Sequence, residues 1–320
     1  MSVQPATPLP AQVIQGEFSD AGSLGRVIGF EIDFRQLDNA RQNIPATILA
    51  GNHVTLLKMH FNCGYHQCAY APSGAITVGI PEVGVEDWFG ATYPDQSLLP
   101  FNQASGIDLV SRSDFRAFTI SIMEGFLREV SNSFQLPVAD ALITPSAGAL
   151  IANSPAVLRL RSMVRSLFRE NHPLLGRERE TALAIELLQS GLEGTVATDR
   201  SSPRTRAQAI GKVLDYVDQC KEEVISVGEV CAATGVSWRT LTRAFHERFG
   251  LGPKAYLNRL RLTEVRSQLL IATEKVLITD IANGQGFWHM GQFARDYRLV
   301  YGELPSETLQ RKTDQFRLSR

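Results

Sequence analysis

The chain has 320 residues, with 32 Lys and Arg against 33 Asp and Glu and a net charge of −1. This length is enough for two domains, because domains commonly contain about 100–200 residues. Hydrophobic residues make up 44% of the chain and charged residues 20%. That composition excludes a largely disordered protein, so both halves are expected to contain a core.

The sequence predicts neither secretion nor membrane insertion. No apolar run approaches the roughly 18–20 residues that span a bilayer, and the N-terminus lacks the basic and apolar regions of a signal peptide. We therefore expect a cytoplasmic protein without a membrane partner. The four cysteines are too few for a disulfide framework and are expected to be reduced.

The near-zero net charge conceals a division at Pro203. Residues 1–203 carry a net charge of −6, whereas residues 204–320 carry +5. A basic C-terminal third beside an acidic N-terminal part suggests that one end meets a polyanion. The alternative is that the basic residues are simply solvated.

Residues 1–153 are expected to form an antiparallel β domain. Short β-type stretches begin at His53, Gly74, Gly106 and Phe115, and turn-forming residues separate them. This pattern predicts a sandwich or barrel whose enclosed space holds a small ligand.

Arg112 and Arg116 are the candidate effector-binding residues, placed between the last two of these strands. Two guanidinium groups at the ends of a hairpin suit phosphate recognition. Their spacing resembles the Arg-x-x-x-Arg motif of PilZ-type cyclic di-GMP receptors, although the rest of that pattern is absent. The alternative is that the two arginines pair with Asp114 and Asp108.

Four potential metal ligands, His60, Cys63, His66 and Cys68, lie within nine residues. Zinc accepts His and Cys ligands, but structural zinc sites usually combine two separated pairs. The alternative is that the cysteines are small core residues, so we assign neither a metal nor another cofactor. No catalytic motif is present in the sequence, and we expect a protein that is not an enzyme.

A helical segment is expected at residues 154–192. Ser154 and Pro155 form a typical helix start, and a second amphipathic helix begins at about Glu178. These helices cover the β domain or pair between subunits in a homodimer. Residues 193–206 are rich in Gly, Ser, Thr and Arg and are expected to form the linker.

The last third, residues 207–312, contains an internal repeat. One copy starts at Val227 and the other at Ile278. Leu241, Arg243, Phe245, Gly250 and Pro253 of the first copy correspond to Phe293, Arg295, Tyr297, Gly302 and Pro305 of the second. Each copy predicts a short helix, a turn at a glycine and a second helix, which is a helix-turn-helix.

The second helix of each copy is expected to enter the DNA major groove. Its exposed residues offer guanidinium, hydroxyl and apolar groups for base edges and phosphates. The candidates are Ser237, Trp238, Arg239, Thr240, Thr242 and Arg243 in the first copy and His289, Met290, Gln292 and Arg295 in the second. Arg259 and Arg261, on the helix between the copies, are expected to lie near phosphates.

The linking segment GPKAYLNRLRLTEVRSQLL, the helix ITDIANGQGF and the segment GQFARDYRLVYGELPSETL resemble the AraC/XylS family of bacterial transcriptional regulators. GFWHMGQFARDYR, with the preceding WRTLTRAFHERFGLGP, is most similar to the ethanolamine-utilisation and benzoate or toluate branch. The resemblance implies a cupin-like N-terminal domain, promoter DNA as partner and activation through RNA polymerase. It also implies base contacts by Arg239, Thr242 and Arg243 and by Met290, Gly291 and Arg295.

The sequence thus predicts an α+β protein: a cupin-like antiparallel β domain, a helical dimerisation segment and an all-α domain with two helix-turn-helix motifs. Its expected function is DNA-binding transcription regulation in response to a small effector, with cyclic di-GMP as an anionic candidate. Two alternatives stay open. One is a cupin-type metal-dependent enzyme with a DNA-binding tail, and the other is a dimeric regulator that needs no ligand.

Overall fold

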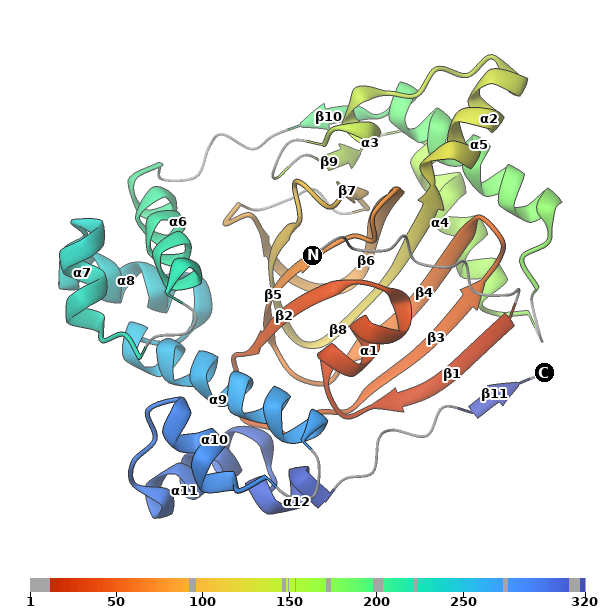
Figure 1. Ribbon diagram of the computed structural model, residues 1–320. Coiled ribbons are helices and arrows are strands. Elements are labelled where there is room, and N and C mark those ends of the chain that lie inside the picture. The colour runs from red at the N-terminus through yellow and green to blue at the C-terminus, as the bar shows by residue number, and fades with distance from the viewer. Residues whose placement is uncertain are drawn as a thin grey trace.

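The structure is a computed structural model in which a curled β sheet is followed by a group of C-terminal helices (Figure 1). The described residues are 12–91, 96–145, 148, 150–152, 154–170, 174–197, 204–220, 224–272, 276–310 and 317–319. The predicted combination of an N-terminal antiparallel, cupin-like β part with a helical C-terminal part is confirmed.

Antiparallel pairing joins the strands in the order β11-β1-β3-β4-β8-β5-β2, and β6 pairs with both β7 and β8. The strands are β1 (Gln12–Phe18), β2 (Glu31–Gln36), β3 (Ile44–Ala50), β4 (Val54–Phe61), β5 (Tyr65–Tyr70), β6 (Ala75–Trp88), β7 (Leu99–Phe101), β8 (Ile107–Met123) and β11 (Arg317–Ser319). β11 follows the last helix in the chain, yet it pairs with β1 at the edge of the N-terminal sheet.

Strand β8 is one continuous strand of 17 residues. The expectation of separate strands at Gly106 and Phe115, with Arg112 and Arg116 at a hairpin, is therefore wrong. Asp114 has a φ of 65°, and the register between β6 and β8 shifts repeatedly nearby. A bulge of this kind interrupts the alternation of apolar and polar residues without ending the strand, and it resembles a turn in sequence.

Alternating side chains of the sheet enter two separate cores. Leu57, Phe61 and Phe115 belong to the core beneath helix α1 (Ala21–Ile28). Leu56 and Ile120 belong to the core on the other face. That second core also contains side chains from α2 (Glu124–Phe134), α3 (Asp140–Ile143), α4 (Pro155–Leu167) and α5 (Arg177–Glu193). Burial on both faces explains why several strands are apolar throughout rather than alternating.

The helix start at Ser154 is confirmed, since the Ser154 hydroxyl accepts a hydrogen bond from the Val157 amide and Pro155 is the first helical residue. Residues 193–206, expected as a linker, include strand β10 (Thr195–Ala197), paired with β9 (Leu150–Ala152). Helices α1 and α2 were not predicted from the sequence. Within the described part of the chain, no helix has the length and apolar character needed to cross a membrane.

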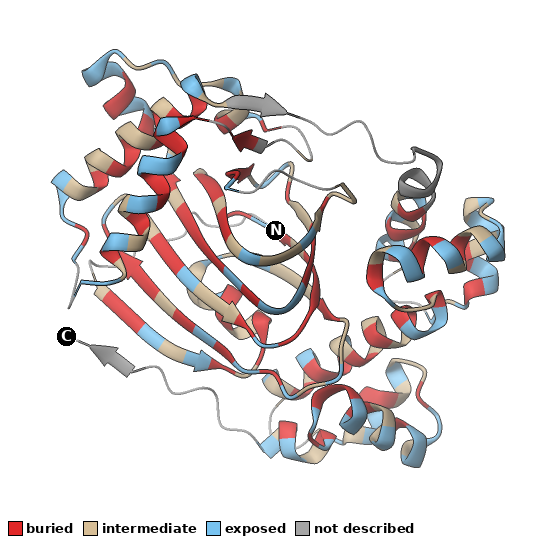
Figure 2. Ribbon diagram, turned by 180° about the vertical axis from the view of Figure 1, so that it is seen from behind, coloured by how far each residue is buried: buried red, intermediate tan, exposed pale blue. Residues whose placement is uncertain are grey.

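The C-terminal helices form two cores that meet at one long helix, α9 (Pro253–Ile271). The first core joins α9 to α6 (Arg204–Gln219), α7 (Val227–Thr234) and α8 (Trp238–Phe249). The second joins α9 to α10 (Ile278–Gly284), α11 (Met290–Tyr301) and α12 (Pro305–Gln310). In Figure 2 buried residues follow the strands and alternate with exposed residues around these helices.

Candidate nucleic-acid interface

The first helix-turn-helix unit consists of α7, a glycine turn and α8. Ser226 and Glu229 form a capping box at the start of α7. Gly235 ends the helix with a φ of 69°, which a residue with a Cβ rarely adopts. The Ser237 hydroxyl then accepts a hydrogen bond from the Thr240 amide at 3.2 Å and caps α8. The predicted helix start at Ser237 is confirmed.

The second unit consists of α10, a turn at Gly286 and α11. Gly286 has a φ of 77°, and His289 is the N-cap residue of α11 without a side-chain hydrogen bond to the helix. Helices α8 and α11 both end at a left-handed glycine, Gly250 and Gly302. The two units therefore share a glycine turn and a left-handed glycine at the end of the second helix, but only the second helix of the first unit, α8, has a side-chain cap. Helices α8 and α11 are called the recognition helices below.

Most predicted DNA-contacting residues of α8 lie at the surface. Ser237, Trp238, Arg239 and Arg243 are exposed, and Arg243 forms an ion pair with Glu247 one turn later. Thr240 and Thr242 are half-buried. The Thr242 hydroxyl is covered and has no hydrogen-bond partner among the described residues, so it lies beneath the exposed face.

Helix α11 presents a different set of groups. His289, Gln292 and Arg295 are exposed, whereas Met290 packs partly against the core of the second unit. The Gln292 side chain accepts from Arg295 at 3.0 Å and donates to Asp296 at 2.6 Å, which orients the amide on the surface.

Trp288 was not among the predicted contact residues, yet its exposure of 73% exceeds the 56% of Trp238. The preceding residue, Phe287, is buried in the core of the second unit. Because an aromatic residue beside a turn is more often part of a core, the sequence contained little signal that Trp288 would be exposed.

The linking helix α9 does not present its arginines as expected. Arg259 is only 9% exposed and donates to the Asp38 carbonyl at 3.0 Å and to the Asn39 side chain at 2.5 Å. Arg261 is half-buried with its guanidinium 5.2 Å from the Phe287 ring centre. The prediction that Arg259 lies near phosphates is wrong, because α9 is packed against the N-terminal part.

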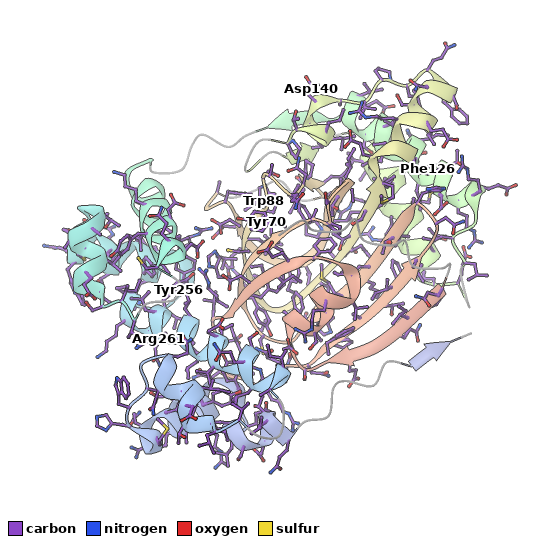
Figure 3. All side chains as sticks on the ribbon, viewed as in Figure 1. Tyr70, Trp88, Phe126, Asp140, Tyr256 and Arg261 are labelled. Carbon is purple, nitrogen blue, oxygen red and sulfur yellow. The ribbon has the colours of Figure 1, made fainter. Side chains whose placement is uncertain are left out.

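A buried polar network joins α8 and α9 to the sheet. Tyr256 of α9 (Figure 3) makes hydrogen bonds with His66 at 2.6 Å and with Arg35 at 2.7 Å through its hydroxyl group. Arg248 of α8 donates to Asp108 at 2.6 Å and to Asp87 at 3.0 Å. These contacts fix the C-terminal end of α8 against strands β6 and β8, and the start of α9 against β2 and β5. The N-terminal end of α8 remains exposed.

The protonation states in this network follow from burial and neighbouring charge. Burial lowers the pKa of His66, which favours the neutral ring. Burial alone would raise the pKa of Asp108, but Arg248 and His66 hold it below its usual value. Burial raises the pKa of Tyr256, so the phenol stays protonated.

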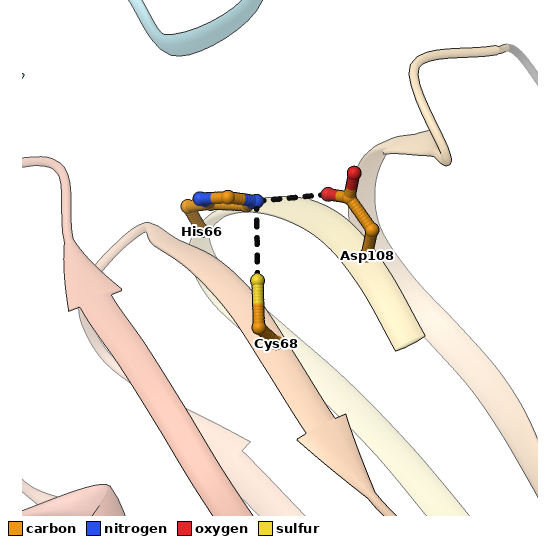
Figure 4. Close-up of side chains that lie close together, drawn as sticks. All are labelled: His66, Cys68 and Asp108. Atoms are coloured by element: carbon orange, nitrogen blue, oxygen red, sulfur yellow. Dashed lines mark hydrogen bonds and ion pairs between the residues drawn. The ribbon is translucent and has the colours of Figure 1, made fainter. Parts of the chain in front are cut away.

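The four candidate metal ligands do not come together. His60 pairs with Asp114 at 2.8 Å, and Cys63 is buried elsewhere near the Ala40 carbonyl. His66 and Cys68 instead adjoin Asp108 (Figure 4), with the His66 ring nitrogen Nε2 3.5 Å from the Cys68 sulfur and 2.8 Å from the Asp108 carboxylate.

This group of three residues is a poor fit for a metal ion. Arg248 donates to the same Asp108 oxygen that accepts from His66. Burial raises the pKa of Cys68 to about 12, so its thiol is protonated at neutral pH. We therefore interpret the group as part of the hydrogen-bonded network between the two halves of the chain.

The two candidate effector arginines each have an acidic neighbour. Arg112 pairs with Glu86, and Arg116 pairs with Asp114 at 2.8 Å. The alternative pairing with Asp114 is thus observed for Arg116, whereas Asp108 pairs with Arg248 and His66.

A large open groove, named the outer groove here, lies on the face of the sheet that packs against α4, next to the end of that helix. Arg116 lines this groove, whereas Arg112 does not. Its volume is about 1150 Å³, and Lys58, His60, Arg165 and Arg169 also line it. Of the acidic lining residues, Glu82 pairs with Arg161 and Arg165. The cavity between the sheet and α1 is apolar and holds only about 60 Å³, far below the roughly 300–1,000 Å³ of typical ligand pockets.

Residues 230–311 match the family described as a helix-turn-helix domain. The XylDLEGF operon transcriptional activator of Pseudomonas putida is 34% identical over 99 residues, which are 31% of this chain and 31% of that activator. The probable thc operon regulatory protein of Rhodococcus erythropolis is 34% identical over 97 residues, which are 30% of this chain and 29% of that protein. The chain thus covers about a third of the length of these relatives.

Solved structures give the following similarities. A probable AraC family transcriptional regulator from Rhodopseudomonas palustris is 36% identical and covers 32% of this chain and 95% of its own, with a TM-score of 0.30. ToxT from Vibrio cholerae is 14% identical and covers 93% of this chain and 96% of its own, with a TM-score of 0.31. Residues 230–311 therefore form a helix-turn-helix domain, and their sequence is similar to part of these transcriptional regulators.

Proposed function

We propose that the protein is a DNA-binding transcription regulator, and specifically an activator, that reads two successive major-groove segments with α8 and α11. The observation that carries this proposal is that two linked helix-turn-helix units each expose polar and cationic side chains on the recognition helix. Arg239 and Arg243 provide guanidinium groups in the first unit, and Arg295 provides one in the second. Arginine in this position recognises guanine through two hydrogen bonds.

The test compares arginine variants on DNA. Replacing Arg239, Arg243 or Arg295 by Ala should reduce discrimination at individual base pairs, by ~1–3 kcal/mol for a two-bonded contact. Met290→Ala should reduce discrimination between bases less, because a half-buried thioether offers only apolar contact. The measurement is binding to a randomised duplex library at two salt concentrations. If Arg243→Ala weakened binding equally for every sequence, α8 would be a phosphate anchor rather than a base-reading helix.

We place the effector site in the outer groove rather than in the space between the sheet and α1. The groove combines cations from several elements with apolar residues such as Phe118 and Phe168, whose rings stack with centres 5.2 Å apart. An anionic small molecule fits this lining, and cyclic di-GMP is the first probe to use. Arg116 is then an effector-binding residue, whereas Arg112, the other predicted residue, pairs with Glu86 and does not line the groove.

Arg116 and Arg112 lie on the same strand, but only Arg116 lines the groove, so variants of the two residues form a matched test. Arg116→Ala should weaken binding of an anionic ligand roughly ten- to hundredfold, the effect of losing one charge-assisted hydrogen bond. Arg112→Ala is the control on the same strand and should change little, because Arg112 does not line the groove. Titration calorimetry with cyclic di-GMP and with aromatic carboxylates measures both. Equal losses of ligand affinity in the two variants would indicate that Arg112 and Arg116 bind the ligand together, and would contradict a site in the groove.

The remaining assignments rest on the resemblance of the C-terminal sequence to the AraC/XylS family of transcriptional regulators. We propose residues 1–153 as the effector-sensing domain, 154–192 as the dimerisation segment and 207–312 as the DNA-binding domain, in a homodimer that contacts RNA polymerase in the cytoplasm. Exposed Leu158 of α4 and Leu192 of α5 support a second copy of the chain packing there. The segment GFWHMGQFARDYR supports the ethanolamine-utilisation and benzoate or toluate branch.

A further inference from the structure

One short segment of the N-terminal part contacts both helix-turn-helix units. This segment, residues 36–41, begins at the end of β2 and is named the bridging segment here. Leu37 packs against the core of the first unit. The Asp38 carbonyl and the Asn39 side chain accept from Arg259 of the linking helix.

The same segment also binds the end of the second recognition helix. The Ala40 amide donates to the Val300 carbonyl at 3.1 Å, and the Gln36 side chain donates to that carbonyl at 3.0 Å. The last carbonyls of a helix have no partner within the helix. Two donors from the N-terminal part therefore fix the C-terminal end of α11.

Among the described residues, few contacts besides those of α9 place the two units relative to each other. Their cores are separate and meet only at α9. Between the units, Val224 lies close to Gly286, and the Arg261 guanidinium stacks on Phe287. The first unit is held to the N-terminal part by Arg248 and Tyr256. The second is held there by Val300, by the Arg41–Glu303 ion pair and by Arg266, which donates to the Ser19 carbonyl. The sheet is thus a common support for both units.

We propose that the bridging segment sets the distance and rotation between α8 and α11, and so makes the protein selective for the spacing between the two halves of its DNA site. This inference rests on the proposed function, since it requires that both helices read DNA. One added base pair moves one half-site by about 3.4 Å and rotates it by about 34°. Two rigidly supported helices cannot follow that change, whereas two loosely linked helices can.

Glycine substitutions offer a matched pair of variants. Gly302 and Gly250 are the left-handed residues that end α11 and α8, with φ values of 66° and 67°. A Cβ at Gly302 would lie 3.2 Å from the backbone nitrogen and the Cβ of Arg41, whereas a Cβ at Gly250 would meet no atom within 4 Å. Gly302→Ala and Gly250→Ala therefore carry the same backbone strain, but only Gly302→Ala also presses a side chain against the bridging segment.

The experiment uses the full chain and duplexes selected by the wild type from a randomised library, with the spacer between the half-sites changed by one base pair in each direction. The wild type should prefer its selected spacer by about tenfold or more, equivalent to ~1.4 kcal/mol. Asn39→Ala, at an exposed position, and Gly302→Ala should reduce that preference to about threefold or less, or shift it to another spacer, with base preferences within each half-site unchanged. Gly250→Ala should keep the wild-type preference.

Two results would overturn the inference: an unchanged spacer preference in Asn39→Ala and Gly302→Ala, or an equal change in Gly250→Ala. A wild type that binds its selected duplex but ignores spacing would also contradict it, while the proposed function would stand. A wild type that selects no sequence would contradict the proposed function itself. Thermal melting of each variant establishes that the chain remains folded.

Discussion

Arg248 illustrates how one side chain of a recognition helix can serve the fold rather than DNA. It lies on α8 only five residues after the exposed Arg243, yet its side chain is 10% exposed and pairs with Asp87 and Asp108. Removing a cation from such a pair leaves buried carboxylates without compensation, which is costly. Arginines on one helix therefore have different roles according to the face they occupy.

The protonation of His66 makes the stability of the buried network depend on pH. Because burial lowers its folded pKa below the unfolded value of about 6.5, the unfolded chain binds more protons below that pH. The stability that the neutral ring contributes is fully present above the unfolded pKa and is lost as pH falls toward the folded pKa. The charged and titratable groups around the ring are Arg35, Cys68, Asp108, Arg248 and Tyr256.

We therefore expect the free energy of unfolding of the wild type to fall between pH 7.5 and pH 5.5, and to fall less in His66→Gln. Urea unfolding at the two pH values measures this difference. His246→Gln, at an exposed position of α8, is the control and should retain the wild-type slope. An identical slope in His66→Gln would show that His66 binds protons equally in the folded and unfolded chains, which would contradict a lowered pKa in the folded state.

At the scale of elements, the two recognition helices differ in how they begin. The Ser237 side chain caps α8, whereas His289 makes no corresponding bond in α11. Ser237→Ala should lower the free energy of unfolding by about 1 kcal/mol. His289→Ala should change it by less, and chemical denaturation of both variants provides the comparison. Equal effects would mean that the Ser237 bond contributes little to the stability of α8.

The helix-turn-helix units could be predicted from sequence because their signals are local. Gly235 and Ser237 specify a turn and a helix start through their own backbone and side-chain preferences. The continuity of β8 was not predictable, since the bulge at Asp114 depends on pairing with β6, a partner far away in sequence. Long-range pairing also determines which strand faces become buried.

The predicted site residues also differ in whether local sequence or long-range contacts determine their position. Arg239, Arg243 and Arg295 occupy exposed positions that helical periodicity indicates. Arg259 could not be assigned correctly, because its partners Asp38 and Asn39 lie more than 200 residues earlier in the chain. A basic residue on a helix has the same appearance in sequence whether it faces phosphate or another domain.

At the scale of the whole molecule, the +5 charge of residues 204–320 is not all directed toward DNA. Arg248, Arg259 and Arg266 bind the N-terminal part or the interior, and Arg266 pairs with Glu303 at 2.6 Å. The cations that remain exposed on α8 and α11 are therefore fewer than the charge of this segment suggests. The same sheet that would bind an effector holds both recognition helices, so ligand binding and DNA reading share one support.

Selection from a fully randomised duplex library by the wild-type chain, followed by sequencing of the bound DNA, tests the central claim most directly. Two recognition helices on one face of DNA should yield two blocks of base preference separated by about one helical turn, ~34 Å. Arg243→Ala should weaken preference in one block only, and Arg295→Ala in the other. Recovered DNA with no base preference, or with a single block that both variants affect equally, would contradict the account.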